Sequence, residues 1–251
     1  MMQLKSAREI AVMAAGGEIL SATLAHAASL VKPGITTWDL DMEIERFIRS
    51  HKGATPAFKG LYGFPGSACI SVNHEVVHGI PSKQRTLVNG DIVTVDIGVK
   101  YDGYYTDSAR TIAVGQIDGE SQRLLDVTKA SLEAGLAACV AGNHLGDVGH
   151  AIQTVVEAAG FSVVRELVGH GVGSSLHEEP QVPNYGKPKR GVKLVPGLTL
   201  AIEPMVNAGR AETKTLADKW TVVTVDGSRS AHFEHTVAIT ADGPRVLTRA
   251  A

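Results

Sequence analysis

The sequence predicts an α/β (α+β) fold built from two related halves. Helical patterns at residues 6–30 and 36–52 precede strand-like runs, and the same order returns after helical patterns at 121–140 and 147–159. Asp147 and Val155 of the second copy correspond to Asp39 and Phe47 of the first, an offset of 108 residues. No linker rich in Pro, Ser or Gly separates the copies, so we expect residues 1–251 to form a single domain.

Capping and stop signals bound the four helices. Ser6 and Glu9 have the spacing of a capping box, and Pro33 ends the first helix. The second helix begins near Thr36 and carries apolar residues at helical spacing. The third and fourth helices are predicted at 121–140 and 147–159, and Gly160 ends the fourth.

Apolar and β-branched runs predict the strands, at 68–72, 91–100, 104–114, 162–166, 198–203, 221–225 and 232–240. A loop rich in Gly, Pro and aromatic residues, 55–66, precedes them. Asp102-Gly103 is a strong signal for a two-residue hairpin turn. If residues 101 and 104 pair across it, residue 98 pairs with 107 and residue 96 with 109. Asp96 and Asp107 then lie on one sheet face as diagonal neighbours, about 7–8 Å apart at Cα.

Composition excludes several classes of function. The 251 residues are 44% hydrophobic and 20% charged, and the net charge of −2 gives no reason to expect DNA or an anionic membrane as a partner. The two cysteines form no CxxC motif, which suits a reducing compartment. No apolar leader is visible at the N-terminus, and Glu18 and His26 interrupt the apolar run at 10–31, which we interpret as a core helix. We expect a cytoplasmic protein.

Four carboxylates lie in or beside apolar strands, namely Asp96, Asp107, Glu203 and Glu234. Burying one unpartnered carboxylate costs several kcal/mol, and a whole protein is stable by only about 5–15 kcal/mol. His170 stands between glycines that let the backbone approach closely. Four carboxylates and an imidazole that converge are the donors that divalent metal ions bind.

Other interpretations of these residues remain open at this level. The hairpin aspartates could include one solvated residue, and Glu203 and Glu234 could form surface ion pairs at strand ends. The segment from His74 to His78 has the letters of the HExxH zinc motif. That motif needs a helix, and Val76-Val77 followed by Gly79-Ile80-Pro81 argues against one.

The order and spacing of several motifs resemble bacterial type I methionine aminopeptidases of the M24 peptidase family over nearly the whole chain. The motifs are Cys69–Asn73, His78–Pro81, Asp96 with Asp107, Gly169–Gly173, His177–Pro180, Ile202–Met205 and Phe233–Thr236. The resemblance implies the pita-bread (creatinase/aminopeptidase) fold, two pseudo-symmetric halves around a dimetal centre. It also implies that Asp96, Asp107, His170, Glu203 and Glu234 are the five metal ligands.

The resemblance further implies a reaction. The enzyme would remove the initiator methionine from nascent proteins, with a preference for a small second residue, and would act as a monomer. The donor set suits two ions of Co, Mn, Fe or Zn. Glu203 would be the general base, His177 would stabilise the carbonyl oxygen, and His78 would contact the scissile amide nitrogen. His78 and His177 would also contact the substrate.

The methionine pocket implied by the resemblance is apolar, with a wall of Phe58, Leu61, Phe64, Cys69, Leu176 and Trp220. Other members often carry Cys, Tyr and Phe where this chain has Phe58, Leu61 and Leu176, and Gln where it has His232. These departures concern the shape of the pocket. An apolar wall still suits the unbranched thioether of methionine.

Two further features concern partners. Some members of the family hold a monovalent cation, whose ligands here would be the carbonyl groups of Asn73, Glu75 and Ser230. Residues 183–194 form a loop with four basic side chains, Lys187, Lys189, Arg190 and Lys193. We interpret it as a solvated connection and keep a contact with the ribosome near the exit tunnel as the alternative.

Two rival functions remain. A proline-directed aminopeptidase shares the fold but carries an additional N-terminal domain, for which we find no counterpart. A non-catalytic binding protein of the same fold would have lost metal ligands, whereas all five are present. Metal content and methionine release from a Met-Ala peptide discriminate among the three.

Overall fold

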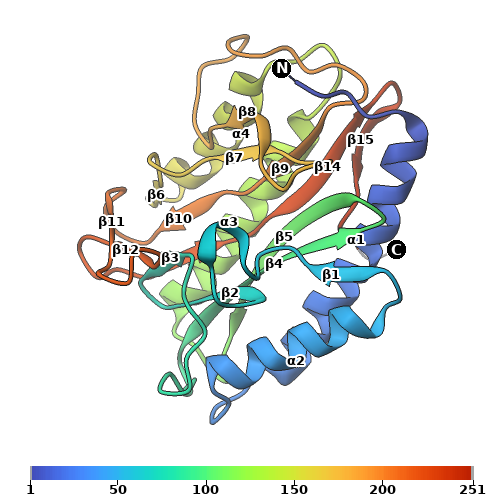
Figure 1. The fold of residues 1–251 in the computed structure, drawn as a ribbon. Coiled ribbons are helices and arrows are strands. Elements are labelled where there is room, and N and C mark those ends of the chain that lie inside the picture. The colour runs from blue at the N-terminus through green and yellow to red at the C-terminus, as the bar shows by residue number, and fades with distance from the viewer. Residues whose placement is uncertain (1, 250–251) are drawn as a thin grey trace.

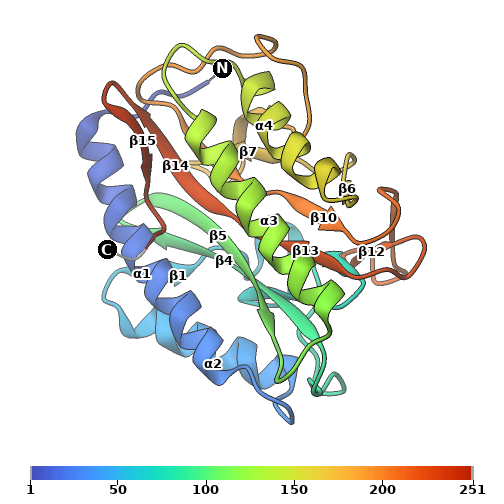
Figure 2. The same ribbon diagram turned by 180° about the vertical axis from the view of Figure 1, so that it is seen from behind.

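The computed structural model describes residues 2–249 and arranges their strands in four sheets, with helices outside them. Helices α3 (Gly119–Ala138) and α4 (Leu145–Ala158) lie side by side across the back of the strands (Figure 2). Helices α1 (Ala7–Leu30) and α2 (Thr37–Ser50) form the corresponding pair in the first half (Figure 1). This is the mixed α/β architecture that the sequence predicts.

Capping residues, of which only the Ser6–Glu9 pair was predicted as a capping box, set where three of the helices begin. The Ser6 N–H donates to the Glu9 carboxylate over 2.7 Å, and the Glu9 N–H donates back to Ser6 Oγ, which confirms the capping box. Helix α3 begins two residues earlier than predicted, because Asp118 accepts a hydrogen bond from the Ser121 N–H and caps it. Helix α4 also begins two residues early, after His144, whose N–H donates to Asp147.

Among residues 2–249, α1 is the one helix whose length and composition would allow it to cross a membrane. Half of its apolar window is buried inside the fold. Its buried residues, which include Leu20 and Leu24, pack with Leu40 and Ile44 of α2. This is the environment of a core helix.

The hairpin of β4 (Ile92–Tyr101) and β5 (Tyr104–Ala113) has the predicted register. Tyr101 faces Tyr104, Gly98 faces Asp107, and Asp96 faces Ala109. Strands β1 (Ala54–Pro56) and β2 (Ala68–Val72) pair with the other edge of β4. Asp96 and Asp107 therefore lie on one face of this sheet.

The second half is built on a sheet in the order β15-β14-β9-β7-β8, with bounds Gly243–Val246, His235–Thr240, Thr199–Ile202, Gly169–Gly171 and Glu178–Val182. Two small sheets complete the fold. One has the order β13-β10-β6, with bounds Ser230–His232, Met205–Asn207 and Ser162–Val163, and the other has the order β11-β12-β3, with bounds Thr213–Thr215, Val222–Thr224 and Glu75–Val77.

The two halves join where β5 meets the start of β14. The Glu234 N–H donates to the Ala109 carbonyl over 2.9 Å, and the Asp107 N–H donates to Thr236 Oγ1 over 2.9 Å. Thr236 Oγ1 in turn donates to the Asp107 carbonyl. Each half has its own core, with Ile70 and Val95 in one and Leu200 and Val237 in the other. The junction, rather than either core, holds the buried carboxylates.

Several predicted element boundaries were wrong. The strand predicted at 232–240 is interrupted at Phe233–Glu234, and the one predicted at 162–166 covers only two residues. The predicted loop 55–66 contains part of β1 and a 3₁₀ turn at Leu61–Gly63. Strands β3, β7, β8, β10, β11 and β15 were not predicted. These segments have three to five residues and owe their conformation to pairing with distant strands, which leaves little periodic signal.

Candidate metal centre

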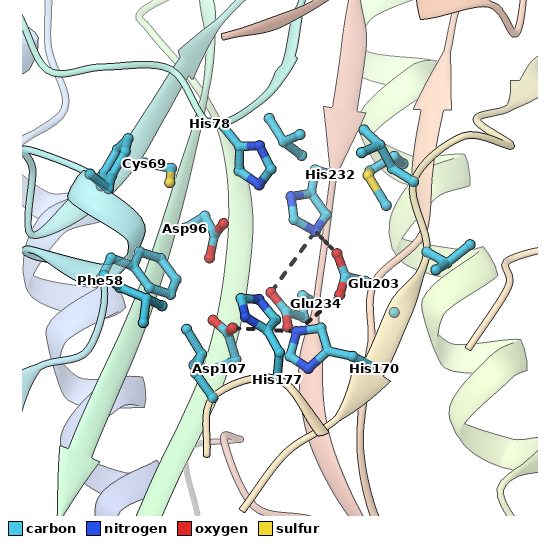
Figure 3. A pocket seen from close by; sticks show the side chains of 18 of the residues that line it. Phe58, Cys69, His78, Asp96, Asp107, His170, His177, Glu203, His232 and Glu234 are labelled. Carbon is cyan, nitrogen blue, oxygen red and sulfur yellow. Dashed lines mark ion pairs between the residues drawn. The ribbon is translucent and has the colours of Figure 1, made fainter. Parts of the chain in front are cut away.

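The five residues predicted to bind metal converge on one cavity between the two halves (Figure 3). Asp96 and Asp107 enter from the β4–β5 hairpin, and His170 enters from β7. Glu203 follows the last residue of β9, and Glu234 stands immediately before β14. Residues separated by more than a hundred positions thus meet because the halves pack edge to edge.

The distances among the donor atoms are short enough for a shared ion. His170 Nε2 lies 3.8 Å from Asp107 Oδ2 and 3.5 Å from Glu203 Oε1. Asp107, His170 and Glu234 each offer one ligand atom within 4.8 Å of the others. The His170 Nδ1 atom lies 2.8 Å from the Gly171 carbonyl oxygen, an acceptor that favours the proton on Nδ1. The lone pair of Nε2 is then free to face the carboxylates.

The electrostatics of the cluster disfavour its charged forms when no cation is present. Burial, together with neighbouring carboxylates, raises the pKa of Asp96, Glu203 and Glu234 well above their ordinary values. Burial raises the pKa of Asp107 to about 7 and lowers the pKa of His170 to about 4. A divalent cation among these groups would reverse this preference, because it favours the ionised carboxylates.

Buried polar atoms without hydrogen-bond partners indicate whether the residues of the cluster suit a metal ion. Asp96 Oδ1, Asp107 Oδ1 and Glu234 Oε1 are buried, and none has a hydrogen-bond partner among residues 2–249. Buried polar atoms in a stable protein are normally paired, and unpaired ones indicate an unseen ion or water. Carboxylate oxygens with one imidazole nitrogen are the donors of Mn, Fe, Co and Zn sites. The donor set fits a divalent metal.

Two neutral histidines flank the carboxylates. The ring of His177 lies 4.5 Å from that of His170, and His78 lies edge-on to Trp220 with ring centroids 6.4 Å apart. Burial lowers the pKa of both His78 and His177, so each is a neutral N–H donor near pH 7. His78 has a positive φ of 59° and follows β3, which rules out the helix that the HExxH motif needs. The segment from His74 to His78 therefore does not form the helical HExxH motif, as predicted.

The six predicted pocket residues line the same cavity, which has a volume of about 500 Å³. Phe58, Phe64, Cys69 and Leu176 are buried, and Phe64 contacts Trp220 edge-on at 5.1 Å. Gly98 makes room for Phe58, since a Cβ at this glycine would lie 2.6 Å from the Phe58 ring. Burial and the Asp96 carboxylate raise the pKa of the Cys69 thiol, which keeps it neutral. The wall beside the carboxylates is therefore apolar.

Some lining residues were missed by sequence reasoning. Tyr62 is exposed at the mouth of the cavity, with φ of 52° and its ring 6.1 Å from that of His177. Its place between two glycines of the predicted loop was the available signal. Leu167 and Met205 also line the cavity and carry no local signal. His232 was noted only as a departure from the family, yet it lies between Glu203 and Glu234.

The remaining predicted features are surface or backbone features. Lys187, Lys189, Arg190 and Lys193 are exposed, while Asn184 at the start of their loop is buried and donates to the Glu203 carbonyl over 3.0 Å. The Asn73 carbonyl accepts a hydrogen bond from the Ser230 N–H over 2.9 Å. The predicted roles of these residues in ribosome and cation binding stay predictions.

Comparison with known proteins shows which family the chain resembles. The model of metallopeptidase family M24 matches residues 11–241. Methionine aminopeptidase 1 of Bacillus subtilis is 55% identical over 98% of this chain and 98% of its own length, and methionine aminopeptidase of Clostridium perfringens is 52% identical over 99% of each.

Solved structures agree in fold. The crystal structure of methionine aminopeptidase from Thermotoga maritima is 46% identical, with a TM-score of 0.97 over the full length of both chains. A prolidase from Pyrococcus horikoshii shares the fold at 21% identity and a TM-score of 0.78, and this chain spans 64% of it. The chain therefore belongs to the M24 metallopeptidases, and within them to the methionine aminopeptidases, with the pita-bread fold that the sequence predicts.

Proposed function

We propose that this chain removes the N-terminal methionine of nascent proteins by metal-dependent hydrolysis of the first peptide bond. The observation that carries the proposal is a buried cluster of carboxylates and histidines beside an apolar cavity of about 500 Å³. Relatives that cover 98–99% of this chain at 51–55% identity are named methionine aminopeptidases. This reading is favoured over a proline-directed enzyme and over a non-catalytic binding protein.

The metal would be held by Asp96, Asp107, His170, Glu203 and Glu234. We propose two ions of Mn, Fe, Co or Zn, because four carboxylates with two oxygens each and one imidazole nitrogen offer nine donor atoms, more than the six that one octahedral ion binds. When bound, such ions supply an activated water and a Lewis acid for the carbonyl group of the substrate. The remaining chemistry belongs to side chains of the cavity.

Glu203 is the proposed general base. Its carboxylate lies within the donor cluster, 3.5 Å from His170 Nε2. From this position Glu203 can take a proton from the attacking water and later release it to the departing amine.

His177 and His78 would act on the two ends of the scissile amide. Both are neutral, so each can donate an N–H without adding a positive charge. His177 would donate to the carbonyl oxygen as negative charge develops there, and His78 would contact the amide nitrogen. The position of both rings on the cavity wall supports these roles.

The apolar wall sets the proposed specificity. Phe58, Phe64, Leu176 and Trp220 surround a space that an unbranched thioether side chain can fill without leaving a polar group unpaired. A free α-amine near the carboxylate cluster would explain removal of the first residue alone. The second residue would lie near Tyr62 and His177 at the cavity mouth, where a small side chain meets least obstruction.

Other properties stay predictions. We expect a cytoplasmic monomer that acts on emerging N-termini. We expect the basic loop at 183–194 to be a solvated connection, with a ribosome contact as the alternative. We also expect that a monovalent cation, if bound, uses the carbonyl groups of Asn73, Glu75 and Ser230.

A peptide panel with defined metals tests the proposal. Metal-free protein is reconstituted with Mn, Fe, Co or Zn and incubated with Met-Ala-Ser, Leu-Ala-Ser, Lys-Ala-Ser, Met-Lys-Ser and Ala-Pro-Ser. We expect methionine release from Met-Ala-Ser far above every other peptide. Cleavage of Ala-Pro-Ser above Met-Ala-Ser would favour the proline-directed alternative. No release with any metal, from protein that binds metal, would favour the binding protein.

A further inference from the structure

His232 is a buried histidine that the proposed mechanism does not use. It ends strand β13, and its side chain is 1% exposed. Neither Nδ1 nor Nε2 has a hydrogen-bond partner among residues 2–249. A buried polar atom without a partner destabilises the folded protein, so two on one ring require an explanation.

The backbone holds this ring toward the carboxylates. The His232 N–H donates to Thr111 Oγ1 over 2.8 Å, and Thr111 Oγ1 donates to the His232 carbonyl over 2.9 Å. On its other side, His232 pairs with Met205 of β10. With both backbone edges fixed, the side chain projects into the cavity that also holds His78, Glu203 and Glu234 (Figure 3).

Two carboxylate oxygens face the same ring nitrogen. His232 Nε2 lies 3.9 Å from Glu203 Oε2 and 3.9 Å from Glu234 Oε2. A shift of about 1 Å would bring either contact to normal hydrogen-bond length. Because anionic oxygens stand opposite Nε2, the tautomer with the proton on Nε2 is favoured.

His170 shows the opposite arrangement. Its Nδ1 faces the Gly171 carbonyl over 2.8 Å, which leaves the lone pair of Nε2 directed at the cluster. His232 has no such acceptor at Nδ1 among the described residues, so nothing directs an Nε2 lone pair toward a metal. The two histidines thus differ in function: His170 suits a ligand and His232 suits a donor.

We propose that His232 is a positioning residue whose Nε2–H donates to the facing oxygens of Glu203 and Glu234 and orients both carboxylates. Each glutamate then keeps its other oxygen for metal. This inference rests on the proposed metal-binding role of the two glutamates. Groups that hydrogen-bond to metal ligands in this way typically contribute about 10–100-fold to metal affinity or activity.

Two substitutions separate a donor from a ligand and from a space-filling residue. His232→Gln keeps an N–H donor, whereas His232→Leu removes it at similar size. His150→Leu, on the exposed face of α4, is the matched control. Metal-free proteins are titrated with Mn²⁺ by calorimetry, and kcat and KM are measured on Met-Ala-Ser.

We expect His232→Gln to stay within about 3-fold of the wild type, and His232→Leu to bind Mn²⁺ about 10–100-fold more weakly at unchanged stoichiometry. Its kcat should fall more than its KM changes, since Glu203 is the residue misplaced. If circular dichroism shows that the leucine variant does not fold, His232→Met takes its place, because it also lacks an N–H.

Two results would overturn the inference. Wild-type Mn²⁺ affinity in His232→Leu would make the ring a space-filling residue. Loss of one bound ion in both variants would make it a ligand. A wild-type protein that binds no Mn²⁺, Fe²⁺, Co²⁺ or Zn²⁺ would instead remove the proposed function, and this inference with it.

Discussion

Replacing Lys5 by methionine should destabilise the protein and disturb the segment that carries His177. Lys5 Nζ pairs with the Glu178 carboxylate, and the two side chains are only 3% and 7% exposed. The Lys5 N–H donates to the Gly197 carbonyl over 2.7 Å, which fixes the segment before α1. Gly173 completes the contact, because a Cβ there would lie 2.1 Å from Lys5 Cε.

The size of the destabilisation follows from the interactions that Glu178 loses and from those that it keeps. Removing one partner of a buried ion pair typically costs about 3–5 kcal/mol, because the other charge stays buried and unpaired. Glu178 keeps hydrogen bonds from Ser174 Oγ over 2.9 Å and from the Ser175 N–H over 3.1 Å. We therefore expect a loss near the lower limit, about 3 kcal/mol in the free energy of unfolding at pH 7.

The effect should depend on pH. Burial tends to raise the pKa of Glu178, but the hydrogen bonds from Lys5 and the Ser175 N–H outweigh it and lower that pKa below its ordinary value of 4.5. A carboxyl group whose folded pKa is depressed stabilises the protein above its unfolded pKa, and the stabilisation is lost as the pH falls through the folded pKa. The difference in the free energy of unfolding between the wild type and Lys5→Met should thus be largest at pH 7 and should decrease below pH 4.5.

Urea unfolding of metal-free protein at pH 7 and at pH 4 measures both effects. Lys5→Arg should retain most of the stability, and Lys129→Met, at an exposed position of α3, should change it by less than about 0.5 kcal/mol. At pH 7 with metal, kcat of Lys5→Met should also fall, because Glu178 adjoins His177. A Lys5→Met variant as stable as Lys129→Met would show that the Lys5–Glu178 pair does not stabilise the fold.

Three further predictions concern catalysis, packing and metal. His177→Ala should lower kcat by about 10²–10³-fold while metal content stays at the wild-type level, as single-turnover kinetics and metal analysis on one sample would show; loss of metal would make His177 a ligand. Gly17→Ala should destabilise the protein in urea by at least about 1–3 kcal/mol, because the new Cβ would lie 2.0 Å from the Leu247 carbonyl oxygen; Gly119→Ala, which meets no atom within 4 Å, is the control. Chelation should abolish methionine release and lower Tm, because metal that binds only the folded state stabilises it; an unchanged Tm would argue against a resident ion.

The β4–β5 hairpin shows what could be predicted from the sequence alone. The turn at Asp102-Gly103 fixed the register, and the register put Asp96 and Asp107 on one face without any information on the rest of the fold. The buried carboxylates were likewise visible as charges within apolar runs. Both predictions depend on turn preference and hydrophobicity within short segments, and both properties can be read directly from the sequence.

The rest depends on contacts between distant segments. Strands β7 and β8 have three and five residues, and two of the three residues in β7 are glycines, so their pairing shows no alternation in the sequence. Tyr62 reaches the cavity mouth because a left-handed backbone turn projects it there. His232 lies between two carboxylates because β13 packs against β10 and β5. The spacing of residues in the sequence does not predict this packing.

Metal stoichiometry and methionine release in variants of Asp107 and Glu234, two of the proposed metal ligands, give the sharpest test of the proposed metal centre. Asp107→Asn and Glu234→Gln keep side-chain size but remove a charge from the cluster, while Asp242→Asn removes an exposed charge far from it. The measurements are metal bound per chain at saturating Mn²⁺ and turnover of Met-Ala-Ser at limiting Mn²⁺. We predict about two bound ions and full activity in the wild type and in Asp242→Asn, with lost activity and reduced metal in the other two. Wild-type turnover in Asp107→Asn or Glu234→Gln at limiting metal would contradict it.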